Sequence, residues 1–297
     1  MIIDTHQHVF WHGRDDAGLI ADMDEHGIDL AWLLTWEVPA DEDAGEYHRV
    51  LNPANVRADG THAGITLSDS LRARDRYPDR FIVGYCPNPR QPNAPGLFES
   101  AVKMHDVRLC SEWKFRIPFD DPRSIELFRA AGQYHAPVVL HLDMPWLPDD
   151  QGKLVFQPNW YGGTVANLRR ALEACPDTVF IGHAPGFWRE ISGDADDAGQ
   201  NYPDGPVTPG GRLFELFDSF SNLYADLSAG SGLNALKRDP DHAKQFLLRY
   251  QDRLLFGRDY YGGDLDSFLG TIDLPQEVAA KIHCENAQKL VPVSTNP

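Results

Sequence analysis

Two histidines near the start of the chain have the spacing of a metal-binding pair. His6 and His8 follow the β-branched residues Ile2 and Ile3, so the first ten residues are predicted to form a strand. Residues two apart in a strand lie on the same face, which places both imidazoles side by side. Imidazole nitrogens are ligands of divalent metal ions. Two such histidines can also serve only as hydrogen-bonding groups within a core, and the rest of the chain must distinguish these interpretations.

Further polar residues stand at or near the ends of short apolar runs. These runs are predicted to be strands at 30–35, 80–85, 107–115, 137–142, 178–183, 223–227 and 253–257. Several are apolar almost throughout, as in parallel strands that are buried on both faces. The polar residues at their ends are Glu112, Lys114, His141, His183 and Asp259. We therefore expect these side chains to converge at one edge of a parallel sheet.

Helical patterns alternate with the predicted strands. They lie at 17–26, 65–77, 97–105, 122–135, 164–174, 212–220, 241–251 and 276–290. Strands that alternate with helices along one uninterrupted chain predict a (β/α)8 TIM barrel, formed by residues 1–297 as a single domain. Long irregular segments at 36–62, 143–162 and 184–211 are predicted to form the walls of a pocket at the C-terminal ends of the strands.

The composition excludes several classes of protein. A net charge of −17 and a pI near 5.0 oppose nucleic-acid binding, which requires a positive surface. There is no apolar run of the length that a membrane span needs and no secretory signal, so we expect a cytoplasmic protein without a membrane partner. The four cysteines lack CxxC spacing, which argues against a disulfide framework and against a cysteine zinc site.

These residues together resemble the amidohydrolase superfamily, and more closely its amidohydrolase-related, or type 2, branch. The resemblance covers essentially the whole chain, including the closing segment 281–290. It is carried by His-Gln-His at 6–8, Val-Leu-His-Leu-Asp at 139–143, Ile-Gly-His-Ala-Pro at 181–185 and Phe-Gly-Arg-Asp-Tyr at 256–260. The branch includes nonoxidative decarboxylases and sugar-lactone hydrolases as well as uncharacterised hydrolases.

The resemblance implies a role for each matching residue. One divalent ion, Zn²⁺ or alternatively Mn²⁺, would be held by His6, His8, His141 and Asp259. His183 would be either a further ligand or a catalytic acid/base, and Asp259 would also take a proton from the metal-bound water. Neutral imidazole and carboxylate groups suit both ions. Zinc lowers the pKa of bound water to about 7, which provides hydroxide at neutral pH.

The fourth predicted strand carries two more candidates. Alternation places Glu112 and Lys114 on one face together with Cys110, and Leu109 and Trp113 on the other. We expect the first face to line the barrel interior, with Glu112 and Lys114 as a buried ion pair in the pocket. The alternative is that either residue bridges two metal ions, as in binuclear relatives.

Other residues are predicted to contact the substrate. Lys114 or Arg116 is suited to hold a substrate carboxylate. Trp11, after the first strand, and Trp146, in the second long segment, are predicted to form aromatic walls of the pocket.

Two reactions and one non-catalytic role are consistent with these residues. The leading hypothesis is a metal-dependent hydrolase, in which metal-activated water attacks an ester, lactone or amide carbonyl of a small substrate. The alternative reaction is nonoxidative decarboxylation of a small aromatic or enol carboxylate. A barrel that binds a metal or a small ligand without turnover stays open as a third possibility. The expected partners are a small-molecule substrate and, by the resemblance, a second copy in a homodimer.

Overall fold

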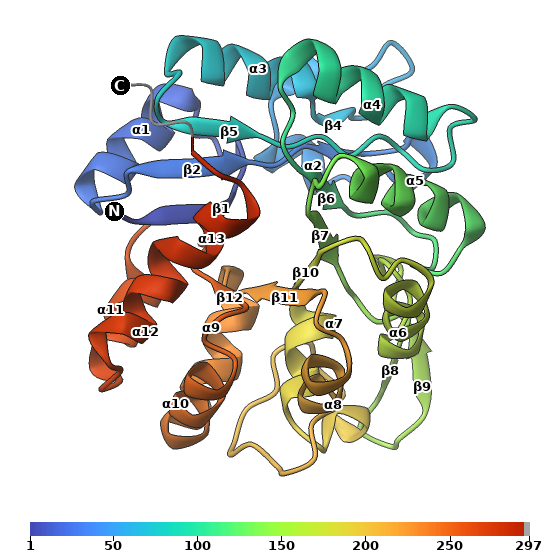
Figure 1. Ribbon diagram of the computed structural model, residues 1–297. Coiled ribbons are helices and arrows are strands. Elements are labelled where there is room, and N and C mark those ends of the chain that lie inside the picture. Colours follow the sequence, from blue (N-terminus) through green and yellow to red (C-terminus); the bar gives the residue numbers. More distant parts are fainter. Residues whose placement is uncertain (294–297) are drawn as a thin grey trace.

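Eight short parallel strands form the centre of the fold (Figure 1). The computed structural model describes residues 1–293. The strands are β1 (Ile3–Gln7), β2 (Leu30–Leu33), β5 (Phe81–Val83), β6 (Cys110–Trp113), β7 (Val138–His141), β10 (Phe180–His183), β11 (Leu223–Asp226) and β12 (Leu254–Leu255). Each lies within one of the segments that the sequence predicts to be a strand.

The strands close into a barrel. They pair in parallel in the orders β1-β2-β5 and β12-β11-β10-β7-β6. A parallel bridge between Gly84 and Leu109 joins β5 to β6. At the other seam, the Thr5 amide donates to the Phe256 carbonyl at 2.9 Å, and the Asp259 amide donates to the His6 carbonyl at 2.7 Å. The predicted (β/α)8 barrel is therefore confirmed.

Helices surround the strands in an outer ring (Figure 1). They are α1 (Asp16–Glu25), α3 (Leu67–Arg76), α4 (Ala94–His105), α5 (Pro122–Gln133), α6 (Val165–Ala174), α8 (Arg212–Ser219), α10 (Pro240–Arg249), α12 (Gln276–Ala280) and α13 (Asn286–Leu290), the last two joined by a π-helical turn, η5 (Lys281–Glu285). Several of these helices have an N-cap side chain. In α1, for example, the Asp15 carboxylate accepts a hydrogen bond from the Gly18 amide. Among residues 1–293, no helix is both long and apolar enough to cross a bilayer.

The interior of the barrel is apolar below the functional residues. A buried cluster fills it with one or more side chains from each strand, including Ile3, Trp32, Ile82, Leu109, Val139, Ile181, Tyr224 and Leu255. Val139 and Ile181 stand two residues before His141 and His183, so the same inward-facing rows end in histidine. The polar side chains are thus held above a packed apolar floor.

The prediction of which residues in and next to β6 face the barrel interior is wrong in part. Leu109 belongs to the cluster inside the barrel, whereas Cys110 and Trp113 belong to the outer core beneath the helices. The register between β6 and β7 shifts between Cys110 and Trp113, so simple alternation does not hold along this strand. Glu112 does face the interior, as expected, and Cys110 does not share its face.

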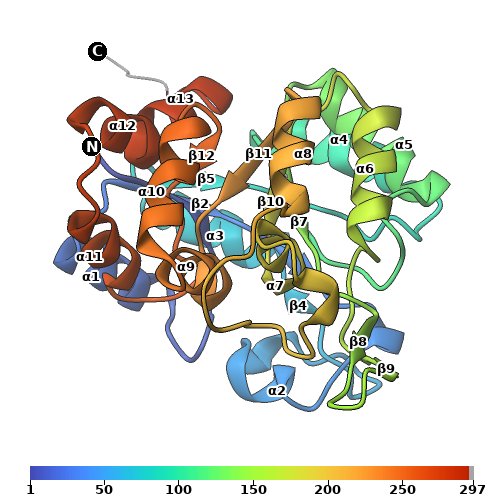
Figure 2. The same cartoon turned by 90° about the horizontal axis from the view of Figure 1, so that it is seen from below.

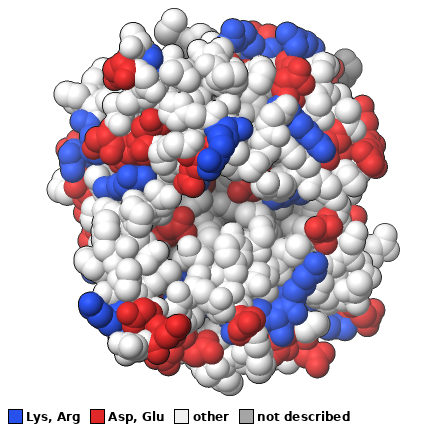
Figure 3. All heavy atoms as spheres, turned by 180° about the vertical axis from the view of Figure 1, so that it is seen from behind, with Lys and Arg blue, Asp and Glu red and all other residues white. Residues whose placement is uncertain are grey.

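Additional elements gather at the C-terminal ends of the strands. The first long segment, 36–62, holds β3 (Trp36–Glu37), η1 (Ala40–Glu42), α2 (Tyr47–Val50) and η2 (Pro53–Asn55), and β4 (Gly64–Ile65) follows it, where the sequence predicts the start of the helix 65–77. The other two hold the hairpin β8 (Trp146–Pro148) and β9 (Leu154–Phe156), then α7 (Pro185–Trp188), η3 (Arg189–Ile191) and η4 (Ala195–Asp197). The sequence analysis missed α9 (Ala229–Lys237) and α11 (Asp264–Thr271). Figure 2 shows α2, α7 and the β8–β9 hairpin at one end of the molecule, and Figure 3 shows a hollow in that face.

A buried ion-pair network stabilises the seam between the first and last strands. Residue Arg258 is only 6% exposed, and its guanidinium pairs with Asp4 at 2.6 Å and Asp22 at 2.7 Å. Because Arg258→Ala leaves the buried Asp4 carboxylate without its cation, and leaves Asp22 paired with one arginine, Arg14 at 3.0 Å, we expect it to lower the free energy of unfolding by about 3–5 kcal/mol. The control Arg249→Ala, which removes an exposed pair with Asp218, should cost about 0–1 kcal/mol. Urea denaturation followed by circular dichroism measures both, and equal losses would contradict this account.

Candidate metal centre

Five side chains from four strand ends point their polar atoms at one place. His8 Nε2 lies 3.4 Å from Asp259 Oδ1 and 3.6 Å from Glu112 Oε2. His6 Nε2 lies 3.7 Å from Asp259 Oδ1, and His183 Nε2 lies 3.7 Å from Asp259 Oδ2. Both of these nitrogens are also about 4 Å from Glu112 Oε1, at 4.0 and 3.9 Å. Residues that are far apart in sequence therefore meet at the C-terminal end of the barrel.

The geometry and chemistry of this group fit a divalent cation. Two groups of three residues each have donor atoms that all lie within 4.8 Å of one another. One group is His6, Glu112 and His183, and the other is His6, His8 and Asp259. His6 Nε2 and Asp259 Oδ1 are buried and have no hydrogen-bond partner among residues 1–293. Buried polar atoms without a partner are costly. A cation bound between them would satisfy both, and imidazole with carboxylate is a donor set that zinc and manganese accept.

His141 lies at the edge of this group rather than within it. Its Nδ1 is 2.6 Å from Glu112 Oε1, and its Nε2 is 2.9 Å from Asp143 Oδ2. Both ring nitrogens are therefore engaged, and His141 is in neither set of converging donors. Glu112, which the sequence analysis placed in the pocket wall, occupies a central position among the donors instead.

Asp226, at the end of β11, is a buried carboxylate that the sequence analysis missed. Its Oδ2 accepts from His6 Nδ1 at 2.9 Å, and its Oδ1 lies 3.0 Å from His183 Nδ1 and also accepts from the Ser228 hydroxyl. Because an ionised carboxylate only accepts, the Nδ1 of each ring carries a proton, and in the neutral ring the lone pair is therefore on Nε2, which faces the centre. A signal was available, since Asp226 ends its strand as His141 and His183 end theirs.

Burial and charge set the protonation of these groups. Burial opposes the charged form of His6, but Asp226, Asp259 and Glu112 outweigh it and raise the pKa of His6 to about 9. Burial dominates at His8 and lowers its pKa to about 4. Burial alone would raise the pKa of Asp226, yet His183 and His6 hold it well below its ordinary value. Asp226 is therefore ionised, as its hydrogen bonds to the two histidine rings require.

An aromatic cavity of about 410 Å³ opens beside the centre. Its lining includes Trp11, His12, Trp36, Tyr47, Lys114, His141, Tyr161 and Tyr202. The Lys114 ammonium lies 4.1 Å from the centre of the Trp36 ring. The expected ion pair with Glu112 is not formed, since no carboxylate of residues 1–293 lies within 4.0 Å of the Lys114 nitrogen. The Trp11 indole donates to the Asp259 carbonyl at 2.8 Å.

The two remaining predicted substrate contacts, Arg116 and Trp146, are not in the lining of this cavity, but Arg116 bonds to Asn159, which is. Arg116 donates from its backbone amide to the Glu42 carboxylate at 3.0 Å and from its guanidinium to Asn159 at 2.9 Å. Trp146 is 50% exposed on β8 and packs against Phe156 across the hairpin. Neither residue is among those that line the aromatic cavity.

Comparison with protein families agrees with this arrangement of strands and side chains. The family model described as amidohydrolase matches residues 3–293. The chain belongs to the amidohydrolase family. Its members are metal-dependent enzymes that include hydrolases and decarboxylases. A search of curated proteins finds no match to this amidohydrolase.

Solved structures share the fold across the whole chain. An uncharacterised TIM-barrel protein, Bb4693, from Bordetella bronchiseptica is 16% identical, with 97% of each chain covered and a TM-score of 0.63. A dihydroxybenzoic acid decarboxylase from Polaromonas sp. JS666, with bound manganese and 2-nitroresorcinol, is 17% identical, with 97% of this chain and 96% of that chain covered and a TM-score of 0.59. A probable 2-pyrone-4,6-dicarboxylic acid hydrolase from Acinetobacter baumannii is 15% identical, with 97% and 98% covered and a TM-score of 0.56. At these identities the likeness establishes the fold alone.

Asp226→Asn tests whether this carboxylate orients the two histidines. The asparagine oxygen can accept from Nδ1 of only one of the two histidine rings. Its NH2 group donates to Nδ1 of the other ring, which must then carry its proton on Nε2. Because a protonated nitrogen cannot bind a cation, we expect the affinity for Zn²⁺ to fall roughly 10- to 100-fold. Competition with a chromophoric chelator measures the affinity, and Asp218→Asn at an exposed position is the control. Wild-type affinity in Asp226→Asn would exclude the orienting role.

The affinity for metal should also depend on pH. With a pKa of about 9, His6 carries a proton at neutral pH that a cation must displace, whereas His8, with a pKa of about 4, is already neutral. Binding should therefore tighten about tenfold per pH unit between roughly pH 6 and 8 and level off above about pH 9. Calorimetry in buffers of different ionisation enthalpy should show release of about one proton at pH 7. An affinity that does not change over this range would be the contrary result.

Proposed function

We propose that this amidohydrolase is a metal-dependent hydrolase that cleaves an ester, lactone or amide bond of a small substrate. The observation that carries the proposal is the Asp259 carboxylate, whose buried Oδ1 has no partner and lies 3.4 Å from His8 Nε2 and 3.7 Å from His6 Nε2. His6, His8, Glu112 and Asp259 would hold one divalent ion, Zn²⁺ or Mn²⁺. His141 would join them only if its Nε2 left Asp143.

The chain supplies the proton transfers that hydrolysis needs. When bound, the ion provides a Lewis acid that polarises a carbonyl and acidifies water. Under this proposal, Asp259 would accept a proton from the attacking water. His183, whose Nε2 lies 3.7 Å from Asp259 Oδ2, would pass a proton to the leaving group. Asp226 would hold the His183 ring in position through its contact with Nδ1.

The aromatic cavity is suited to a small substrate with a negative charge. Lys114 lies on Trp36 in the cavity wall and has no carboxylate partner within 4.0 Å in the described chain, so its charge is available to a substrate anion. Tyr47 and Tyr161, joined by a 2.6 Å hydrogen bond between their hydroxyls, bring the first and second long segments together beside it. A volume of about 410 Å³ is within the range of small-molecule sites.

Nonoxidative decarboxylation is the second candidate. Lys114 could equally hold the carboxylate of a substrate that loses CO2, with a protonated His183 delivering H⁺ to carbon. The decarboxylase of the same fold that binds manganese favours this reading. Both reactions use the same side chains, so the product must decide between them.

Turnover of a substrate panel tests the proposal. The protein loaded with Zn²⁺ or Mn²⁺ should hydrolyse one or more lactones or p-nitrophenyl esters, and chelation should abolish the activity while circular dichroism is retained, because the apolar floor does not depend on the ion. His183→Asn should keep the metal and lower kcat roughly 10²- to 10⁴-fold. His6→Ala should lose the metal.

The outcomes of this panel separate the candidates. Release of CO2 from aromatic carboxylates without ester or lactone cleavage would replace the hydrolase by a decarboxylase. Stoichiometric metal with no turnover on any member would favour a binding protein. Full activity in His183→Asn would remove this residue from the mechanism.

A further inference from the structure

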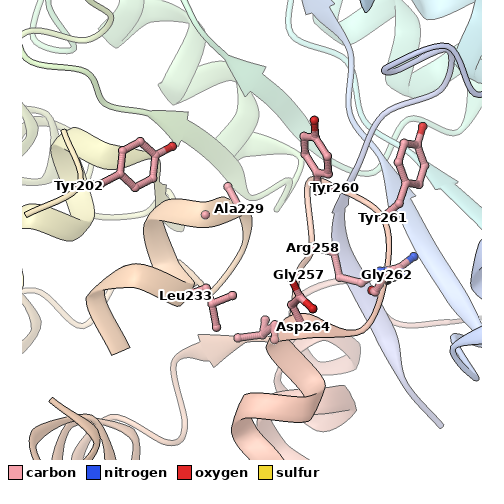
Figure 4. A pocket seen from close by; sticks show the side chains of 11 residues that line it. Tyr202, Ala229, Leu233, Gly257, Arg258, Tyr260, Tyr261, Gly262 and Asp264 are labelled. Atoms are coloured by element: carbon pink, nitrogen blue, oxygen red, sulfur yellow. Dashed lines mark hydrogen bonds between the residues drawn. The ribbon is translucent and has the colours of Figure 1, made fainter. Parts of the chain in front are cut away.

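A second cavity of about 390 Å³ lies beside the mouth of the barrel (Figure 4). It is a slot between the start of α9 and the segment 257–265, which runs from β12 into α11. One wall carries Leu233 and the opposite wall carries Tyr260 and Tyr261, with Tyr202 at one side. No step of the hydrolysis described above uses this space.

The slot adjoins the candidate metal centre. Tyr202 lines both this slot and the aromatic cavity that holds Lys114. Tyr260 directly follows Asp259, and its hydroxyl lies 3.3 Å from His12 Nδ1, a residue of the aromatic cavity. The opposite wall begins at Ala229, next to the Ser228 that contacts His183. Both walls thus continue from the strand ends that bear the catalytic groups.

The lining of the slot is matched to an uncharged group. Its one basic side chain, Arg258, is already paired with Asp4 at 2.6 Å and Asp22 at 2.7 Å. In Figure 4 its guanidinium points toward Gly262 and away from Leu233. The carboxylate of Asp264 lies in the lining and disfavours an anion. Leucine side chains, tyrosine rings and glycine backbone make up the remainder, which suits an apolar group.

The two cavities therefore differ in their basic side chains. The lining of the aromatic cavity includes the cation of Lys114 together with the carboxylates of Glu46 and Asp143, whereas the slot contains no unpaired basic side chain among the described residues that line it. A substrate that spans both would place its anionic end beside Lys114. Its uncharged end would then pass Tyr202 and enter the slot, with the metal centre between the two ends.

We propose that the slot is a second compartment of the substrate site and takes an apolar aromatic or short alkyl group. Tyr202 stands between the compartments, 47% exposed, with its ring 3.4 Å from the position that a side chain at Gly230 would occupy. This inference rests on the proposed function, because it takes the aromatic cavity as the place where the reaction occurs.

Phenylalkanoates of increasing length test the compartment. Calorimetry on the Zn²⁺-loaded protein should show that the best of 3-phenylpropanoate, 4-phenylbutanoate and 5-phenylpentanoate binds roughly 10- to 50-fold tighter than benzoate, because the ring and chain bury additional apolar surface. Leu233→Trp, which fills the slot, should abolish that gain and leave benzoate binding as in wild type. Leu248→Trp, at a half-buried position on α10 that lines neither cavity, is the matched control and should keep the gain.

Equal loss for all probes in Leu233→Trp, or a gain that persists in it, would overturn the proposal. A crystal structure of the wild-type complex with the tightest probe gives a test that needs no variant, and a phenyl ring anywhere but between Leu233 and Tyr260 would also overturn it. The two proposals fail separately. If the slot binds the probes as expected but the protein hydrolyses no substrate, only the proposed hydrolase activity is excluded. If the protein hydrolyses esters but probe affinity does not depend on chain length, only the proposed second compartment is excluded.

Discussion

The arrangement of the centre depends on one carboxylate shared by two histidines. Asp226 reaches His6 from one oxygen and His183 from the other, so a single charge links the first, sixth and seventh strands of the barrel. With both Nδ1 protons directed at Asp226, Nε2 is the atom of each ring that faces the centre, and it becomes an acceptor when the ring is neutral. The same buried charge raises the pKa of His6.

The barrel makes this sharing possible because it closes. His6 and Asp259 lie on the first and last strands and come together only at the seam, where the Asp259 amide donates to the His6 carbonyl at 2.7 Å. Arg258 and Asp4, the residues beside the seam on each strand, form a buried pair there. Fold stability and site geometry are thus determined at the same seam, and a change that opens it should affect both.

The sequence predicted the barrel well, because period-two strands, helical stripes and strand-end histidines are local signals. It predicted less about contacts made between strands. The positions of Glu112 among the converging donors and of His141 at their edge depend on the hydrogen bonds of His141 to Glu112 and Asp143, and the position of Cys110 depends on a register shift in β6. Asp226 carried a readable signal, since it ends a strand, but its two partners could be known only from the closed barrel. The contacts of Lys114 likewise required the path of the first long segment, which brings Trp36 beneath it.

The distribution of charge around the mouth suggests how a substrate is oriented. A protein with a net charge of −17 repels anions in general, so Lys114, which has no carboxylate partner within 4.0 Å among residues 1–293, is a local exception. Under the proposed function, Lys114, which contacts the Trp36 ring, would bind one end of the substrate. The slot beyond Tyr202 would take the opposite end against a lining that is apolar except for the tyrosine hydroxyls, the Asp264 carboxylate and the paired Arg258. Charge at one end and burial of apolar area at the other would fix the bond between them over the metal centre, and that positioning is independent of which reaction follows.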